Sequence, residues 1–262
     1  MLLVDQRKID HNHFPDGTLH IAVNGSMYAH HTITWKYESD EELFALVCIV
    51  KHMRSIVEHC ELVLELPYIP HARMDRVKKK SDVFTLKYFA QVINDLNFVA
   101  VRVLDPHSYV SDALIERIEY FSVDALVEKV IDKAKPDLLF YPDEGAMKRY
   151  SSMIQKPYAF GIKRRDWETG KIEGLDVAGN VGDIAGKDIL IVDDICSRGG
   201  TFYFAAKKLK ELGANNVYLY VSHCENTILN GEVLNGDLVK RVYTTDSIFT
   251  KSHPKIEVFS YA

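Results

Sequence analysis

Residues 188–201 read Asp-Ile-Leu-Ile-Val-Asp-Asp-Ile-Cys-Ser-Arg-Gly-Gly-Thr, and this stretch decides the fold. The apolar run at residues 189–192 is short and bounded by acids, which is typical of a buried parallel strand. Apolar residues then recur at helical spacing from about residue 201 to residue 212, and Gly213 can end a helix there. The stretch therefore predicts a strand, a glycine-rich turn and a helix in succession.

The turn between this strand and this helix carries groups that can bind a ligand. Asp193 and Asp194 are expected at the carboxyl end of the strand. Backbone N–H groups in a glycine-rich turn and at a helix N-terminus can hold a phosphate. Carboxylates beside it can accept hydrogen bonds from sugar hydroxyls or hold a hydrated metal ion. A sugar phosphate suits both parts, although acids and glycines are also common in ordinary strand–helix turns.

The composition narrows the class of protein. Of 262 residues, 47% are hydrophobic and 26% are charged, as in ordinary globular proteins. The net charge of −5 gives no basic excess that would indicate nucleic acid or an anionic membrane. No apolar run reaches the roughly 18 residues that span a bilayer, and the first residues lack the pattern of a secretory signal. We therefore expect a cytoplasmic protein with no nucleic-acid and no membrane partner.

The four cysteines, Cys48, Cys60, Cys196 and Cys224, form no Cys-x-x-Cys pair. Their spacing indicates neither a disulfide framework nor a zinc site.

The chain contains two series of alternating strands and helices. The first has helical spacing at residues 39–59 and 83–97 and strand patterns at 61–66 and 98–104. The second has a helix at 122–134 and strands at 137–142, 189–192, 216–221, 238–244 and 255–259. This alternation predicts an α/β protein with two similar domains, 1–120 and 121–262, each with a mainly parallel sheet flanked by helices.

Polar residues follow the predicted strands of the first half. Residues 67–76 read Pro-Tyr-Ile-Pro-His-Ala-Arg-Met-Asp-Arg, and His107 follows the strand at 98–104. In open α/β folds, ligands bind at the carboxyl ends of parallel strands. Arg73 and Arg76 could bind phosphate oxygens through their forked guanidinium groups. A solvated charged loop and a structural histidine are the alternatives.

The second half adds an acid and a basic segment. Asp143 follows the strand at 137–142, and residues 163–171 read Lys-Arg-Arg-Asp-Trp-Glu-Thr-Gly-Lys. We expect a mobile loop there, which either closes over an anionic substrate or is merely solvated. Carboxylates, a histidine and several cations together suit phosphoryl or pyrophosphoryl transfer with magnesium. No G-x-x-x-x-G-K-[ST] loop is present to hold a nucleoside triphosphate.

Five or six motifs, in the family's order along the chain, resemble the ribose-phosphate pyrophosphokinase family, which has the type I phosphoribosyltransferase fold. Residues 192–201 resemble its phosphoribosyl-pyrophosphate motif and residues 67–76 its nucleotide-binding segment. The remaining motifs are residues 14–17, 105–107, 141–145 and 163–165. The resemblance covers residues 12–250 approximately.

The resemblance implies an activity: ATP and ribose 5-phosphate give AMP and 5-phosphoribosyl 1-pyrophosphate. The C1 hydroxyl of the ribose attacks the β-phosphorus of ATP, and AMP leaves. It also implies an N-terminal ATP-binding domain, a C-terminal ribose-5-phosphate-binding domain, a requirement for Mg²⁺, and a homo-oligomer that is a dimer or larger.

The resemblance further implies a role for each matched residue. Ribose 5-phosphate would be bound by Asp193, Asp194, Ser197, Arg198, Gly199, Gly200 and Thr201. ATP would be bound by Arg73, Asp75, Arg76 and His107, and by Phe14 and Asp16 of a neighbouring subunit. The metal would be held by His107 and Asp143, and the catalytic residues would be Lys163, Arg165 and His107.

The chain departs from the family pattern in several places. Ser197-Arg198 replaces the usual Asp-Thr, Thr18 replaces an acid, and Met74 replaces a glutamine. The chain is also shorter than typical members, and we expect it to lack an initial strand–helix unit and a C-terminal helix that help to build the oligomer. Two other functions stay open: a phosphoribosyltransferase that consumes phosphoribosyl pyrophosphate, and a non-catalytic regulatory homologue.

Overall fold

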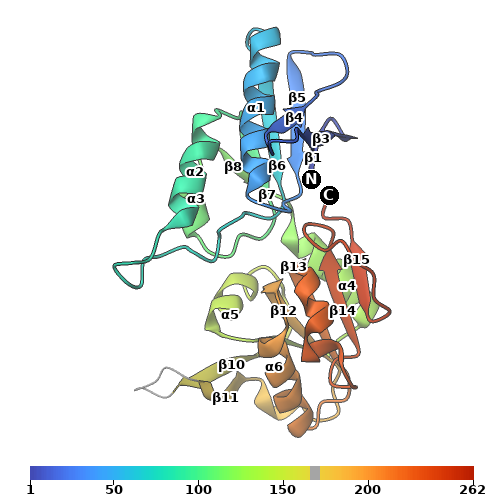
Figure 1. The fold of residues 1–262 in the computed structure, drawn as a ribbon. Coiled ribbons are helices and arrows are strands. Elements are labelled where there is room, and N and C mark those ends of the chain that lie inside the picture. Colours follow the sequence, from blue (N-terminus) through green and yellow to red (C-terminus); the bar gives the residue numbers. More distant parts are fainter. Residues whose placement is uncertain (166–171) are drawn as a thin grey trace. The chain divides into compact units, whose positions relative to one another are not determined.

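The computed structural model describes residues 1–165 and 172–262, which form two compact units, Met1–Phe121 and Ser122–Ala262. We call them unit 1 and unit 2 (Figure 1). Each unit has a sheet with mainly parallel strands and helices packed against it, so the predicted fold class is confirmed. The roles predicted for the domains 1–120 and 121–262 stay a prediction.

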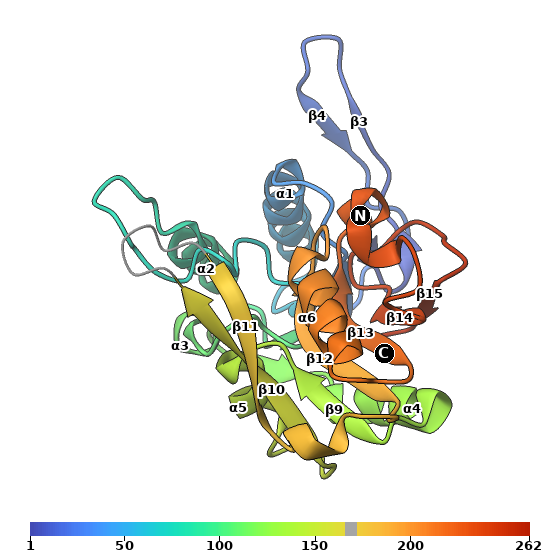
Figure 2. The same ribbon diagram turned by 90° about the horizontal axis from the view of Figure 1, so that it is seen from below.

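Unit 1 is built on a six-stranded sheet in the order β2-β1-β5-β6-β7-β8. Its strands are β1 (Leu2–Val4), β2 (Arg7–Lys8), β5 (His30–Trp35), β6 (Glu61–Leu66), β7 (Ala100–Val103) and β8 (Ile118–Tyr120). Strands β5 to β8 are parallel, and β1 is antiparallel to both of its neighbours. A separate hairpin of β3 (His11–His13) and β4 (Leu19–Ile21) projects away from the rest of unit 1 (Figure 2).

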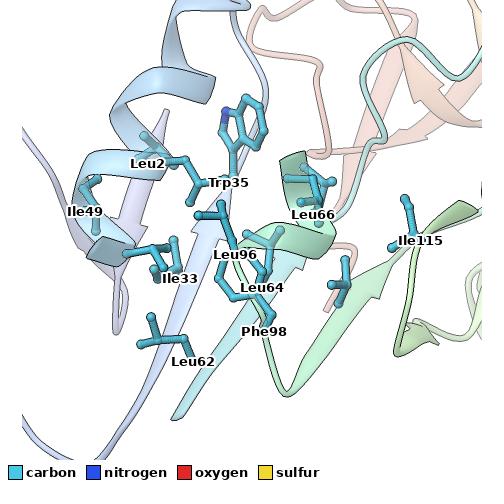
Figure 3. Packing of buried hydrophobic residues seen from close by; sticks show 14 of the residues in the cluster. Leu2, Ile33, Trp35, Ile49, Leu62, Leu64, Leu66, Leu96, Phe98 and Ile115 are labelled. Carbon is cyan, nitrogen blue, oxygen red and sulfur yellow. The ribbon is translucent and has the colours of Figure 1, made fainter. Parts of the chain in front are cut away.

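Three helices complete unit 1: α1 (Glu41–Ile56), α2 (Thr85–Asp95) and α3 (Val110–Leu114). In α1 the buried apolar residues recur at helical spacing, so this helix packs one face on the sheet. In β6 alternate residues are buried, as expected for a pleated strand. Figure 3 shows part of the resulting core, which includes Ile33, Trp35, Ile49, Leu62, Leu64, Leu66 and Phe98.

Unit 2 is built on a seven-stranded sheet in the order β11-β10-β9-β12-β13-β14-β15. Its strands are β9 (Leu138–Tyr141), β10 (Tyr158–Arg165), β11 (Ile172–Gly179), β12 (Ile189–Cys196), β13 (Val217–Cys224), β14 (Arg241–Thr245) and β15 (Ile256–Phe259). All neighbouring pairs are parallel except β10 and β11. Strand β12 therefore lies between β9 and β13, inside the sheet.

The helices of unit 2 are α4 (Val123–Ala134), α5 (Glu144–Tyr150) and α6 (Gly200–Glu211). Three short 3-10 helices are η1 (Val181–Asp183), η2 (Asn226–Asn230) and η3 (Glu232–Leu234). Helix α6 buries Phe202, Ala205, Ala206 and Leu209 in the core that also holds Ile191 and Val221 of the sheet. The predicted strand–turn–helix at residues 188–212 is thus present.

Two details of the predicted elements are wrong. Strand β12 does not end before the two acids but continues to Cys196, so Asp193 and Asp194 lie inside it. The reason is tertiary: β13 is long enough to pair with this extension, with Asp193 opposite Val221 and Cys196 opposite Cys224.

The second detail concerns residues 163–171, which were expected in a loop. Residues 163–165 instead belong to β10, whose antiparallel partner β11 was not predicted at all (Figure 2). Residues 166–171 of the expected loop lie outside the described residues.

Within the described ranges, no helix is both long enough and apolar enough to cross a membrane.

Candidate active site

Residues 197–201 join β12 to α6 and include the first two residues of the helix, and we call them the 197–201 loop. The conformation of this loop depends on a glycine. Gly199 has φ +78°, in the left-handed region that strains other residues. A Cβ at this position would also lie 2.5 Å from Cγ1 of Val233. Helix α6 starts at the next residue, and the Tyr203 N–H donates to the Gly199 carbonyl at 2.9 Å. Backbone conformation and packing together therefore fix the position of the helix N-terminus.

Three carboxylates of unit 2 lie at this end of the sheet. Asp143 is the N-cap of α5, where its Oδ1 accepts a hydrogen bond from the Ala146 N–H at 3.1 Å. Asp193 accepts a hydrogen bond from the Asp194 N–H at 2.9 Å. Because β9 and β12 are parallel neighbours, Asp143 comes close enough to Asp193 for the two charges to repel each other. The structure thus brings these predicted residues together.

One acid of this cluster, Asp193, has a strongly raised pKa. Burial raises the pKa of Asp193 well above its ordinary value, and the negative charges of Asp194 and Asp143 raise it further. Asp194 has a counter-charge in the Arg149 guanidinium, with Nη1 3.5 Å from its Oδ1. A cation or several hydroxyl donors beside Asp193 would relieve the repulsion.

The same carboxylates fit a magnesium ion. Mg²⁺ prefers oxygen ligands and is usually held by one or two carboxylates together with water and substrate phosphates. Over residues 1–165 and 172–262, no group of three or more His, Cys, Asp or Glu could hold a metal ion through the protein alone. One or two of these carboxylates could therefore share such an ion with a bound phosphate.

The polar residues of the 197–201 loop differ in how they are held. Ser197 is partly buried, and its Oγ lies 3.2 Å from Oγ1 of Thr227. Arg198, Gly200 and Thr201 are exposed. The loop thus offers a guanidinium group and hydroxyls beside a helix N-terminus, which suits an anionic ligand.

In unit 1, Asp75 and Arg76 form a two-point ion pair. The Arg76 Nε and Nη2 donate to the two carboxylate oxygens of Asp75 at 2.7 and 2.9 Å. These hydrogen bonds lower the pKa of Asp75, and Ser108 and His107 lower it further. His107, which follows β7, thus lies near Asp75. Three of the predicted ATP-binding residues therefore form one cluster.

The rest of the 67–76 segment is anchored by buried residues. Ile69 and Ala72 are buried, while Arg73 is exposed. His71 has φ +64°, its carbonyl accepts a hydrogen bond from the Met74 N–H at 2.8 Å, and its Nε2 lies 3.1 Å from Asp40. This turn holds the segment in place and leaves Arg73 facing solvent.

Phe14 and Asp16 lie on the β3–β4 hairpin, apart from the Asp75 cluster. Phe14 is 52% exposed, and its ring meets that of His20 edge to face. The hydroxyl and the backbone N–H of Thr18 donate to Asp16 at 2.7 and 3.0 Å, which lowers the pKa of Asp16. Thr18, which replaces an acid of the family pattern, thus orients the Asp16 carboxylate through two hydrogen bonds.

Two other predicted residues are described only in part. The backbones of Lys163 and Arg165 belong to β10, and their side chains lie outside what the structure describes.

Two neighbours of the site were not predicted from the sequence. They are Arg149, which pairs with Asp194, and residues 225–234, which lie beside the 197–201 loop. Arg149 lies on α5, the helix that follows Asp143. A basic residue on the helix after a strand-end acid is a signal that could have indicated the pair.

Comparison with known proteins shows which family this chain belongs to. Residues 113–249, more than half of the chain, match the family described as "Phosphoribosyl transferase domain". The chain belongs to the phosphoribosyltransferase domain family. The match covers almost all of unit 2, including the acids of β12 and the loop before α6, and stops short of most of unit 1.

Relatives of this family member extend the match into unit 1. A ribose-phosphate pyrophosphokinase of Saccharolobus solfataricus is 28% identical over 82% of the chain and 76% of its own length. A ribose-phosphate pyrophosphokinase of Bacillus subtilis is 28% identical over 94% of the chain and 79% of its own length. The predicted relationship to ribose-phosphate pyrophosphokinases is confirmed.

A solved structure supports the fold of this phosphoribosyltransferase-family chain. The phosphoribosylpyrophosphate synthetase from Mycobacterium smegmatis matches 97% of the chain and 86% of its own chain, with a TM-score of 0.78. The sequence identity is 19%, so this likeness concerns the fold alone.

Proposed function

We propose that this protein is a ribose-phosphate diphosphokinase. It transfers the β,γ-diphosphoryl group of ATP to the C1 hydroxyl of ribose 5-phosphate and releases AMP. The bond between the α,β-bridging oxygen and the β-phosphorus breaks, and that oxygen leaves with AMP. The C1 oxygen bonds to the β-phosphorus, and the hydroxyl proton passes to solvent. The product is 5-phosphoribosyl 1-pyrophosphate.

One observation carries this proposal. The similarity to ribose-phosphate pyrophosphokinases spans both units, whereas the phosphoribosyltransferase domain match starts at residue 113. A phosphoribosyltransferase alone would use the acids and the loop of unit 2 and leave the Asp75–Arg76–His107 cluster without a role. A diphosphokinase uses both.

Unit 2 is proposed to bind ribose 5-phosphate. The loop of Ser197, Arg198, Gly199, Gly200 and Thr201 would hold the 5-phosphate at the N-terminus of α6. Asp193 and Asp194 would accept hydrogen bonds from the ribose hydroxyls, directly or through a metal-bound water. Such donors stabilise the ionised form of Asp193, which burial and the neighbouring acids disfavour.

Unit 1 is proposed to bind ATP through Arg73, Asp75, Arg76 and His107. Arg73 and Arg76 are exposed and can reach phosphate oxygens, and the buried Asp75 orients the Arg76 guanidinium. Phe14 and Asp16 are proposed to contact the adenine bound to a neighbouring subunit, which requires a homo-oligomer. Thr18 holds the Asp16 carboxylate in one orientation for this contact.

Magnesium is proposed to be held by His107 and Asp143 together with substrate phosphates. The ion would neutralise charge on the transferring phosphates. Lys163 and Arg165 are proposed to add positive charge beside the same phosphates, and His107 to orient them. Because diphosphoryl transfer needs mainly positioning and charge neutralisation, these residues need not form a covalent intermediate.

Phosphorus NMR tests the reaction directly. With ATP, ribose 5-phosphate and magnesium, we expect AMP and a sugar 1-pyrophosphate to appear together and in equal amounts. A matched sample with the metal chelated should form neither. ADP or inorganic phosphate as the main product would contradict the diphosphokinase function.

Two further measurements distinguish the two other functions. Loss of added phosphoribosyl pyrophosphate only when a nucleobase is present would indicate a phosphoribosyltransferase, which the domain match at residues 113–249 also allows. Nucleotide binding without any turnover at high protein concentration would indicate a regulatory homologue.

A further inference from the structure

The loop at residues 197–201 is held by a second segment, residues 225–234, which we call the brace. It follows β13 and consists of η2 and η3 with Glu225 before them and Gly231 between them. The Glu225 N–H donates to the Cys196 carbonyl at 2.8 Å, immediately before the loop. Nothing in the sequence motifs assigns a role to this segment.

Hydroxyl groups join the brace to the loop. The Thr227 hydroxyl donates to Oε2 of Glu225 at 3.0 Å, so its oxygen is left to accept from Ser197, whose Oγ lies 3.2 Å away. This chain of hydrogen bonds favours one orientation of the Ser197 side chain, which stands where the family usually has an acid. A threonine can take this place because its hydroxyl both donates and accepts.

Close packing joins the two segments a second time. A Cβ on Gly231 would overlap the carbonyl oxygen of Arg198 and lie 2.8 Å from its carbonyl carbon. The atoms it would meet are backbone, which cannot move aside as the end of a flexible side chain can. In the same way, Val233 occupies the space where a side chain at position 199 would lie. The brace is therefore packed closely against the loop at Arg198 and Gly199.

We propose that Thr227 and Gly231 are positioning residues for the 5-phosphate of ribose 5-phosphate. They hold Ser197, Arg198 and the N-terminus of α6 in the binding conformation before the substrate arrives. This inference rests on the proposed function, because it takes the 197–201 loop as the phosphate site. Preorganisation of this kind raises affinity by removing the entropy cost of ordering the loop on binding.

The first test compares Gly231→Ala with Gly182→Ala, a control in which the new Cβ meets nothing within 4 Å and φ is not positive. We expect Gly231→Ala to raise the KM for ribose 5-phosphate at least about tenfold and to change the KM for ATP less than twofold. The dissociation constant of ribose 5-phosphate, measured by calorimetry without ATP, should rise by the same factor. Gly182→Ala should change neither.

A milder pair of variants separates positioning from loss of folding. Thr227→Val keeps the shape of the side chain but removes the hydroxyl, and we expect a threefold to tenfold rise in the KM for ribose 5-phosphate. This range corresponds to about 0.7–1.4 kcal/mol, the usual contribution of one hydrogen bond. Thr227→Ser, which restores the hydroxyl, should return most of the affinity. Equal affinity in Thr227→Val, Thr227→Ser and the unchanged protein would overturn the role of Thr227.

Hydrogen–deuterium exchange distinguishes failure of this inference from failure of the proposed function. We expect the amides of residues 197–203 to exchange faster in Gly231→Ala than in Gly182→Ala, whatever the substrate is. Unchanged exchange there would overturn the brace. If exchange is faster in Gly231→Ala but the unchanged protein does not bind ribose 5-phosphate, the result would support the brace and reject the proposed substrate.

Discussion

Asp75 of unit 1 and Asp193 of unit 2 are both carboxylates of the proposed site, but their surroundings shift their pKa values in opposite directions. Arg76 donates two hydrogen bonds to Asp75 and lowers its pKa. Burial and two neighbouring acids raise the pKa of Asp193. The first carboxylate has its counter-charge within the fold, whereas the second is next to further negative charge.

The difference indicates two kinds of binding residue. Asp75 orients the Arg76 side chain that is proposed to face the ligand, so Asp75 contributes to stability with or without the ligand. Asp193 is placed at a cost to the folded state, which a ligand with hydroxyl donors or an accompanying cation would remove. Three predictions test this contrast.

The largest expected effect is on catalysis by Asp193→Asn. The amide keeps the oxygen that accepts from the Asp194 N–H but loses the charge that would hold hydroxyls or a metal-bound water. We expect kcat/KM to fall about a hundredfold or more, as when one electrostatic contact to a transition state is removed. Steady-state AMP formation measures this, with Asp132→Asn on the exposed face of α4 as a charge-matched control. A fall of less than fivefold would remove Asp193 from the site.

The second effect of Asp193→Asn is on stability. We expect the substitution to stabilise the protein although it lowers the activity. Since the folded protein raises the pKa of Asp193 above its ordinary 3.8, folding becomes less favourable as the pH rises through the interval between these values. Asp193→Asn should therefore raise the Tm at pH 7 by about 2–4 °C, which corresponds to roughly 1 kcal/mol in a domain of this size. Calorimetry from pH 7 to pH 4 should show that the Tm difference between Asp193→Asn and the unchanged protein becomes smaller. Protonation at low pH removes the negative charge of Asp193 in the unchanged protein as well. A lower Tm at pH 7 would contradict the contrast.

The smallest effect is expected for Asp75→Asn. Its lowered pKa means that Asp75 stabilises the fold above the ordinary carboxyl range and that this contribution is lost as the pH falls. Arg76 is 66% exposed, so solvent screens the pair, and we expect a loss of only about 0.5 kcal/mol at pH 7. Urea unfolding at pH 7 and pH 4 measures it, and the difference from the unchanged protein should be smaller at pH 4. A stabilised Asp75→Asn would show that the two carboxylates do not differ.

Much of the fold could be predicted because its signals are local. The predicted strand at residues 61–66 coincides with β6, Glu61–Leu66, since alternate burial leaves a period of two in the sequence. The helix expected at residues 122–134 matches α4, Val123–Ala134, for which Ser122 is the N-cap.

The rest depends on contacts between distant segments. The β10–β11 hairpin lacks a clear alternation in its basic part, and it forms by pairing along β9 and with itself. The extension of β12 through its two acids depends on the length of β13.

Candidate residues of the site were found where they follow a strand, and their partners were not. The Asp193–Asp194 pair stands out in the sequence, whereas the contact of Arg149 with Asp194 depends on how α5 packs. Thr227 and Gly231 carry no chemistry that a motif would show. Their place beside the 197–201 loop follows from the path of the chain after β13.

Asp193 lies inside β12, and under the proposed function this position would decide how a sugar is selected. The backbone of Asp193 is paired with β13, and β12 is also paired with β9. This backbone therefore cannot shift to follow a misfitting ligand. Epimers that invert one ring hydroxyl would meet the same fixed oxygens at the wrong angle and lose the contact instead of inducing a new one. If Asp193 binds the ribose as proposed, stereochemical discrimination at the ring would reside in the rigid sheet, and tolerance would be left to the loops.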